Sequence, residues 1–88
     1  MVPIAEIKYS AGMIQKLGSK YGLTKDDVNE ACTPPRIVRT TWDYHPERGR
    51  RLLVRGRTAS GHVLKVVLYP TDDHGVFRLG TAIPGTRE

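Results

Sequence analysis

The chain has 88 residues, and 14 Lys and Arg against 9 Asp and Glu give a formal net charge of +5. This length predicts a single domain over residues 1–88 with a thin hydrophobic core. The hydrophobic content of 39% argues against a disordered tail, and no apolar run approaches the roughly 18–20 residues of a membrane span. A lone cysteine excludes an internal disulfide, and the first residues lack a signal-peptide pattern. We therefore expect a cytoplasmic protein that has no membrane partner and binds anions.

The helical part of the chain, about residues 10–33, reads as two short helices. Ser10 is a suitable N-cap for the first helix, and Gly22 supplies the usual left-handed stop. Thr24, with Asp27 three positions later, has the pattern of a capping box for the second helix. Cys32 lies on the apolar stripe of that helix, so we expect it to be a small buried residue.

The remaining part, about residues 36–82, changes from a helical period to a period of two. Four segments have the alternation of strands between turn formers: Arg36–Trp42, Arg51–Thr58, Val63–Tyr69 and Val76–Thr81. A further short strand at Ile4–Lys8 is compatible with the pattern. The predicted fold class is α+β, with two short N-terminal helices packed on one face of an antiparallel sheet of about four strands.

The central hairpin decides which side chains face the core, because a one-residue slip moves every side chain to the other face. A two-residue loop at Ser60–Gly61 would bury Arg55 and Arg57, which is costly without partners. A three-residue loop that includes His62 turns both arginines outward and pairs Arg57 with Lys65. We predict this second register, with the loop glycine at a positive φ. Its core face holds Leu52, Val54, Leu64, Val66 and Leu68.

All of the net positive charge lies in residues 36–88, which hold ten Lys or Arg and five Asp or Glu. On the first strand Val38 and Trp42 are assigned to the core, which leaves Arg39 on the open face. That face is then predicted to carry Arg39, Arg55, Arg57, Lys65 and Arg78 around Tyr69. Cations around an aromatic side chain suit an RNA backbone with one base stacked on Tyr69.

Metal binding has little support, because the three histidines are far apart and no Cys–x–x–Cys is present. We expect no metal and no cofactor. Metal-free cleavage of RNA needs a base, an acid and cations that stabilise the charged transition state. The candidate cations are Arg57, Lys65 and Arg78. The base or acid is left open between His62, His45 and Glu47, and a site of Arg and Lys alone is also left open.

Three segments resemble BrnT-type toxins, over roughly residues 16–82. Lys20–Ala31 is similar to their Lys–His–Gly–Val–Ser–x–x–Glu–Ala segment. Val54–Leu68 is similar to their Gly–Arg–Thr–x–x–Gly–Arg–x–Leu–x–Val–Val hairpin, and Val76–Ala82 to their Ile–Arg–Ile–Ile–Ser–Ala strand. Tyr21 and Ile83 stand where the family has His and Arg.

The resemblance implies a RelE-like fold and the toxin component of a bacterial type II toxin–antitoxin system. Such a toxin is a metal-independent endoribonuclease that cleaves mRNA or another cellular RNA, inhibits translation and is neutralised by a cognate antitoxin. The family's basic residues match Arg57 and Arg78. The expected assembly is a homodimer or a toxin–antitoxin hetero-oligomer. The alternatives are a non-catalytic nucleic-acid-binding domain and a protein-interaction domain that use the same basic face.

Overall fold

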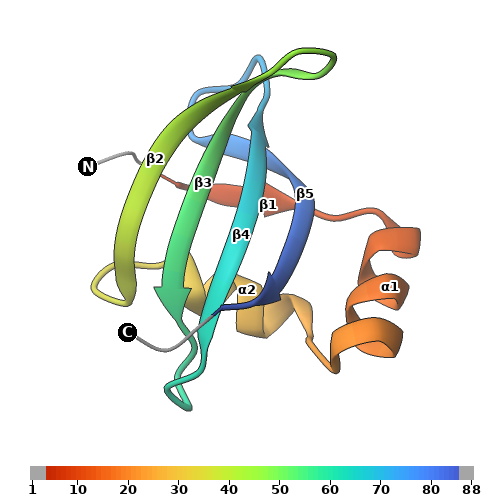
Figure 1. The fold of residues 1–88 in the computed structure, drawn as a ribbon, viewed down its shortest axis with the longest axis vertical. Helices are drawn as coiled ribbons and strands as arrows, with labels where there is room; N and C mark the ends of the chain where they lie inside the picture. Colours follow the sequence, from red (N-terminus) through yellow and green to blue (C-terminus); the bar gives the residue numbers. More distant parts are fainter. Residues whose placement is uncertain (1–3, 86–88) are drawn as a thin grey trace.

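The computed structural model describes residues 4–85, which form two helices and one five-stranded sheet (Figure 1). The elements in chain order are β1 (Glu6–Lys8), α1 (Ala11–Tyr21), α2 (Lys25–Ala31), β2 (Ile37–His45), β3 (Gly49–Arg57), β4 (Val63–Pro70) and β5 (Val76–Pro84). The strand order is β1-β5-β4-β3-β2, and only the β1–β5 pair is parallel. The α+β class is therefore confirmed, with β1 as a fifth strand beyond the expected four.

Both helices begin at the predicted caps. The Ser10 side chain accepts a hydrogen bond from the Met13 N–H at 3.1 Å, and α1 ends at Gly22, whose φ is 67°. In α2 the Thr24 hydroxyl accepts from the Asp27 N–H at 3.2 Å, while the Asp27 carboxylate accepts from the Thr24 N–H at 3.0 Å. These bonds satisfy amides that a helix N-terminus leaves without intrahelical partners, so local sequence determines where both helices begin.

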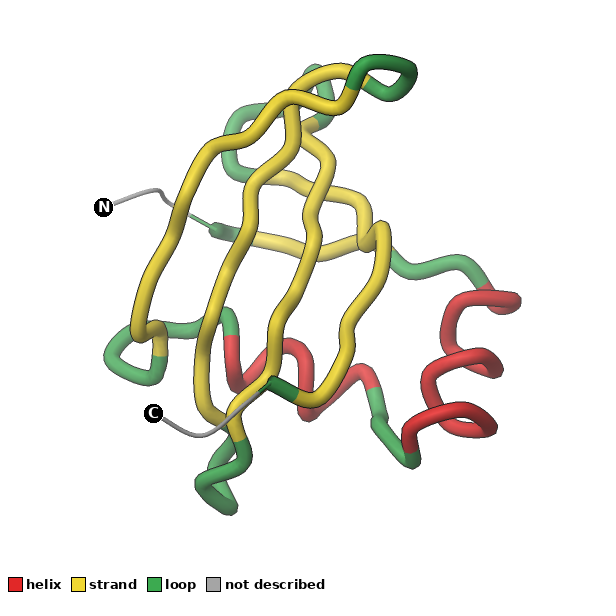
Figure 2. Tube along the Cα trace, in the orientation of Figure 1, coloured by secondary structure: helices red, strands yellow, loops and turns green. Residues whose placement is uncertain are grey.

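The hydrophobic core lies between α2 and the sheet. Helix α2 contacts β3 and β4, whereas α1 contacts β5 at the side of the sheet (Figures 1 and 2). A side chain at Gly56 would collide with the backbone of Ala31, so glycine permits the close approach of α2 to β3. The predicted burial of Cys32 is confirmed. The core comprises Leu17, Val28, Ala31, Cys32, Leu52, Val54, Leu64, Val66, Leu68, Phe77, Leu79 and Ala82.

The central hairpin has the predicted faces but not the predicted pairs. Arg57 lies opposite Val63, and Arg55 lies opposite Lys65, so the predicted pairing of Arg57 with Lys65 is wrong by two residues. The Thr58 N–H donates to the His62 carbonyl at 2.9 Å, so Thr58 and His62 close the loop. The predicted register instead closes the loop with the next residue on each side, Ala59 and Val63. A shift of two residues preserves the alternation of faces, and the loop glycine has the predicted positive φ of 90°.

Strand β2 corrects the assignment of Val38 and Trp42 to the core. Their exposed fractions are 44% and 39%, because β2 is the edge strand and α2 covers β3 and β4. The Trp42 ring lies 6.3 Å from the Phe77 ring, and its other contact is the Arg50 guanidinium, 3.9 Å from the ring centre. Trp42 therefore closes the rim of the core and also packs under a cation.

Candidate nucleic-acid interface

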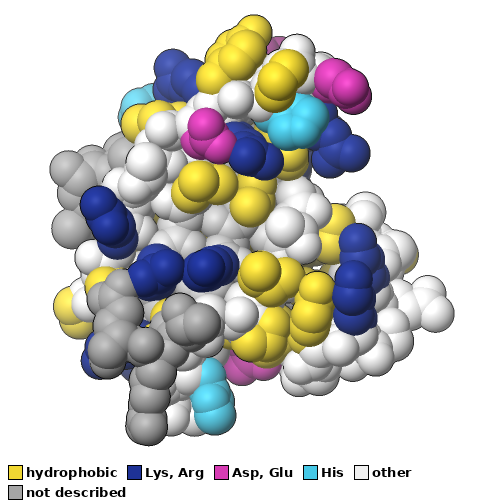
Figure 3. Space-filling model, viewed as in Figure 1, with side chains coloured by type: hydrophobic (Ala, Val, Ile, Leu, Met, Phe, Trp, Pro, Cys, Tyr) yellow, Lys and Arg dark blue, Asp and Glu magenta, His cyan; other side chains and the backbone are white. Residues whose placement is uncertain are grey.

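The open face of the sheet contains a groove of about 370 Å³, and we use the name "the groove" for this site. Lys and Arg side chains gather across the strands on the face seen in Figure 3. The floor of the groove is mainly aliphatic, and its cations come from three neighbouring strands. The residues that line it are Arg39, Thr41, Leu53, Val54, Arg55, Lys65, Val66, Val67, Thr81 and Ile83.

Three of the predicted RNA-binding or catalytic cations lie in one row of the groove. Arg39 on β2 is directly opposite Arg55 on β3, and Arg55 is directly opposite Lys65 on β4. Neighbouring strands are about 4.8 Å apart, so the row crosses the sheet over roughly 10 Å. Like charges directly opposite each other destabilise a sheet, and a bound anion relieves that repulsion. The row is therefore suited to a polyanion that runs across the strands.

Arg78 and Tyr69 lie outside the groove. They are opposite each other on β5 and β4, and Tyr69 is four residues from Lys65, which is roughly 13 Å along a strand. Both line a separate hollow of about 400 Å³, together with Met13 and Arg48. The structure therefore does not bring Tyr69 to the Arg39–Arg55–Lys65 row, as the predicted base-stacking site requires.

An ion pair lies on the same face, beyond the aliphatic part of the groove. Asp43 is directly opposite Arg51, and the guanidinium donates to one carboxylate oxygen at 2.7 and 3.0 Å. This hydrogen bond from Arg51 is the main reason that the pKa of Asp43 is lowered, and the N–H of Tyr44 lowers it further. The same contact raises the pKa of Arg51. Arg51 is therefore neutralised within the sheet by Asp43.

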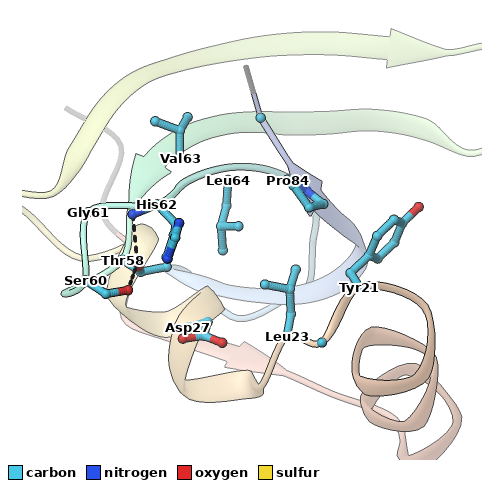
Figure 4. Close-up of a pocket in the computed structure, with 12 residues that line it drawn as sticks. Tyr21, Leu23, Asp27, Thr58, Ser60, Gly61, His62, Val63, Leu64 and Pro84 are labelled. Carbon is cyan, nitrogen blue, oxygen red and sulfur yellow. Dashed lines mark hydrogen bonds between the residues drawn. The ribbon is translucent and has the colours of Figure 1, made fainter. Parts of the chain in front are cut away.

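His62 lies past the end of β3, in a hollow of about 640 Å³ between the α1–α2 turn, the β3–β4 loop and the end of β5 (Figure 4). Its backbone N–H donates to the Thr58 hydroxyl at 3.2 Å, and its carbonyl accepts from the Thr58 N–H at 2.9 Å. Asp27 also lines this hollow, but its carboxylate caps α2. Arg57 lies opposite Val63 at the end of the β3–β4 pair, between His62 and the groove, and its side chain is exposed.

The other two acid–base candidates lie at the opposite end of the sheet. His45 is opposite Gly49 at the turn between β2 and β3. Its ring nitrogen Nδ1 accepts hydrogen bonds from the N–H groups of Glu47 and Arg48, each at 3.1 Å. The visible role of His45 is thus to order the turn. Neither His45 nor Glu47 lines the groove.

The groove also contains residues that sequence reasoning did not select. Leu53, Thr81 and Ile83 line it. The sequence feature that could have identified them is the alternation of each strand, which places them on the same face as the cations. Within residues 4–85, no cluster of three or more His, Cys, Asp or Glu is positioned to hold a metal ion. No helix in the same range is long and apolar enough to cross a membrane.

No family model matches the chain, and no curated protein sequence matches it. The structural observations that bear on function are therefore the groove and its cations. A cationic row above an aliphatic floor, on the sheet face opposite the one that α2 packs against, is an arrangement suited to a flexible polyanion with apolar faces.

Proposed function

We propose that this protein binds RNA in the groove and cleaves it as a metal-independent endoribonuclease. In this proposal it is the cytoplasmic toxin of a type II toxin–antitoxin pair, inhibits translation and is neutralised by a cognate antitoxin. The observation that carries the RNA-binding part is the row of Arg39, Arg55 and Lys65, directly opposite one another across three strands. The remaining parts rest on the resemblance to BrnT-type toxins.

The groove favours RNA over other anions for two reasons. Arginine presents a planar fork that matches phosphate oxygens, and the row provides two such forks and one ammonium group. The aliphatic floor beside the row, formed by Leu53, Val67 and Ile83, offers an apolar surface for the face of an unstacked base. Sequence-tolerant binding of single strands combines these same two features.

The fold supports the family proposal in its outline. After β1, two capped helices precede the other four strands of a mostly antiparallel sheet, an α+β arrangement compatible with the RelE-like fold that the resemblance implies. The glycine of the shared Gly–Arg–Thr motif is Gly56, which permits the close approach of Ala31. The threonine of that motif is Thr58, whose hydroxyl accepts the His62 N–H at 3.2 Å. Two of the three motif residues thus have structural roles, which leaves Arg57 for contact with a ligand.

The proposed reaction is attack by a ribose 2′-oxygen on the adjacent phosphorus. The new bond joins the 2′-oxygen to phosphorus, and the bond from phosphorus to the 5′-oxygen breaks. The products are a 2′,3′-cyclic phosphate and a 5′-hydroxyl, and the proton lost by the 2′-hydroxyl is balanced by the proton gained by the 5′-oxygen. The predicted catalytic cations are Arg57, Lys65 and Arg78, and of these Lys65 lines the groove and is the one expected to stabilise the extra negative charge of a transition state bound there.

A non-catalytic RNA-binding domain is the second candidate, and the composition of the groove favours it. Within residues 4–85, the residues that line the groove include no His, Asp or Glu. Arg57 and Arg78 are also separated by about six strand positions, which is roughly 20 Å. Cleavage in the groove would then depend on charge stabilisation without a neighbouring general base.

Binding is tested with two variants that lose the same charge. One is the triple variant Arg39→Ala, Arg55→Ala, Lys65→Ala, and the matched control is Lys16→Ala, Lys20→Ala, Lys25→Ala, which removes three exposed cations of α1 and α2. Fluorescence anisotropy with a single-stranded RNA should show that only the groove variant loses about 100-fold or more in affinity at low salt. Equal losses in both variants would contradict binding in the groove.

Cleavage is tested separately, with chelator present and the wild-type chain. Incubation with RNA should produce fragments that end in a 2′,3′-cyclic phosphate, and a DNA strand of the same sequence should remain intact. Binding that depends on the groove, without any cleavage, would reject the nuclease and establish the second candidate. Co-expression of the neighbouring gene product should relieve any growth arrest, and failure to do so would reject an antitoxin encoded there.

A further inference from the structure

The outer edge of β2 is a second interaction surface, and it adjoins the groove through Arg39 and Thr41 of the same strand. Strand β2 is nine residues long and ends the sheet, and no other described strand pairs with its outer edge (Figure 1). The opposite edge strand, β1, has only three residues. Long, unprotected edge strands are uncommon in monomers, because they offer unpaired backbone groups to another chain.

Exposed apolar side chains also concentrate on this strand. The described residues include four exposed large hydrophobic side chains, and three of them are on β2: Val38, Trp42 and Tyr44. Tyr44 is the most exposed of the four, at 71%. Trp42 and Tyr44 alternate along the strand and so lie on the same face. An apolar surface beside a free strand edge indicates pairing with another strand.

We propose that the occupant of this edge is β2 of a second copy of this chain, paired antiparallel around a two-fold axis at Thr41. A two-fold axis perpendicular to the sheet keeps the helices of both copies on the same side, so each residue must face one of the same parity. The axis therefore passes through a residue of β2 rather than between two residues. The two five-stranded sheets then form one continuous sheet.

Charge complementarity selects Thr41 among the possible centres. With the axis at Thr41, Arg39 lies opposite Asp43 of the second copy, and the symmetry repeats this pair, which gives two intermolecular ion pairs. A centre at Trp42 would instead place Arg39 opposite His45, and a centre at Thr40 would place Arg39 opposite Thr41. Only the Thr41 centre joins opposite charges, because β2 carries just one acidic residue.

The other face of the strand is also compatible with this register. Thr40 then lies opposite Trp42 of the second copy. Pairs of an aromatic with a β-branched residue are favourable across antiparallel strands. Asp43 is already held at 2.7 Å by Arg51, which keeps its carboxylate oriented on the open face. The proposal does not depend on RNA, and its tests contain none.

A cysteine at the axis tests the register directly. Residues directly opposite in an antiparallel pair have Cα atoms about 4.5–5.5 Å apart, within the range of a disulfide. Thr41→Cys should form a disulfide-linked dimer under mild oxidation, whereas Thr81→Cys, on β5 of the same face, should remain monomeric. A dimer of Trp42→Cys without one of Thr41→Cys would contradict the register, and no difference from Thr81→Cys would overturn the proposal.

Charge reversal tests the ion pairs by analytical ultracentrifugation. The wild-type chain should sediment as a dimer, with twice its mass of 9.8 kDa. Arg39→Asp and Asp43→Arg, each alone, should weaken the dimer by about tenfold or more, because each places like charges opposite one another twice. The double variant exchanges the two charges and should restore the dimer. A monomeric wild type, or a double variant weaker than both singles, would overturn the proposal.

Discussion

Arg55 lies directly opposite Lys65 across the β3–β4 pair, and Arg39 lies directly opposite Arg55 across the β2–β3 pair. Like charges at opposite positions of a sheet reduce its stability. The same face also contains an ion pair between Asp43 and Arg51, at opposite positions of β2 and β3. Three cations at neighbouring positions across three strands are the feature that most directly indicates an anionic partner.

A charge reversal in this row should stabilise the fold and abolish RNA binding together. Lys65→Glu places an acid opposite Arg55, and such a pair contributes about 0.2–1 kcal/mol. In a domain of this size that gain raises the melting temperature by a few degrees, roughly 4–8 °C per kcal/mol. Thermal denaturation at low salt measures it, with Arg57→Glu, opposite Val63, as a control that should give no such gain. A lower melting temperature for Lys65→Glu would contradict repulsion within the row.

A variant of Arg78 distinguishes the catalytic role that the family resemblance implies for this residue from RNA binding in the groove, which Arg78 does not line. Its side chain is exposed, so Arg78→Ala should change the free energy of unfolding by no more than about 0.5 kcal/mol. If Arg78 stabilises the transition state, the cleavage rate should fall by about 100-fold or more. Urea denaturation and a cleavage assay give the two values. If the variant cleaves at the wild-type rate, Arg78 does not stabilise the transition state. If the variant is unfolded, the side chain of Arg78 is not in the exposed position described.

Trp42 and Phe77 should differ in their contribution to stability although their rings are 6.3 Å apart. Phe77 is only 4% exposed, so Phe77→Ala should cost about 3–5 kcal/mol. Trp42 is 39% exposed, and Trp42→Ala should cost clearly less than the Phe77 variant. Chemical denaturation of both variants in one buffer makes the comparison. An equal or greater cost for Trp42 would show that its ring is part of the core.

Cys32 should make the fold sensitive to alkaline conditions. Burial raises the pKa of its thiol from 9.0 to about 12. The folded chain therefore keeps the proton that the unfolded chain loses, and this stabilisation is present below pH 9 and declines as the pH rises toward 12. Burial also raises the pKa of Tyr9, which acts in the same direction.

The measurement is the free energy of unfolding of wild type and Cys32→Ala between pH 8 and 11, from urea denaturation. A single group contributes a slope of up to about 1.4 kcal/mol per pH unit, and the alanine variant should lack that part of the slope. The absolute stability of the variant also changes, so the slope alone is compared. Parallel curves for the two proteins would contradict a buried, protonated thiol.

Local sequence signals predicted the parts of the fold that depend on neighbouring residues. Ser10, Thr24 with Asp27, and Gly22 define both helices through contacts of a few residues. The core face of the central hairpin was also predictable, because burial of Arg55 would have been unfavourable. Its pairing was not, since registers that differ by two residues present the same faces.

The positions that could not be predicted depend on strand order. Trp42 has the composition of a core residue, but β2 is an edge strand that α2 does not cover. Asp43 was expected in a turn, yet its ion pair with Arg51 lies within the extended β2–β3 hairpin. The predicted site divides for the same reason: Arg39 joins Arg55 and Lys65 through neighbouring strands, whereas Arg78 lies four positions farther along the sheet.

The most direct measurement of the central claim is amide chemical-shift mapping by NMR during titration with single-stranded RNA. If RNA binds in the groove, the largest shifts should occur there, at Thr41, Leu53, Arg55, Lys65 and Thr81, and they should reverse with added salt. Residues of α1, which lies beside β5, should shift little. Shifts concentrated on α1 or around His62, with the groove unchanged, would contradict RNA binding on the open face of the sheet.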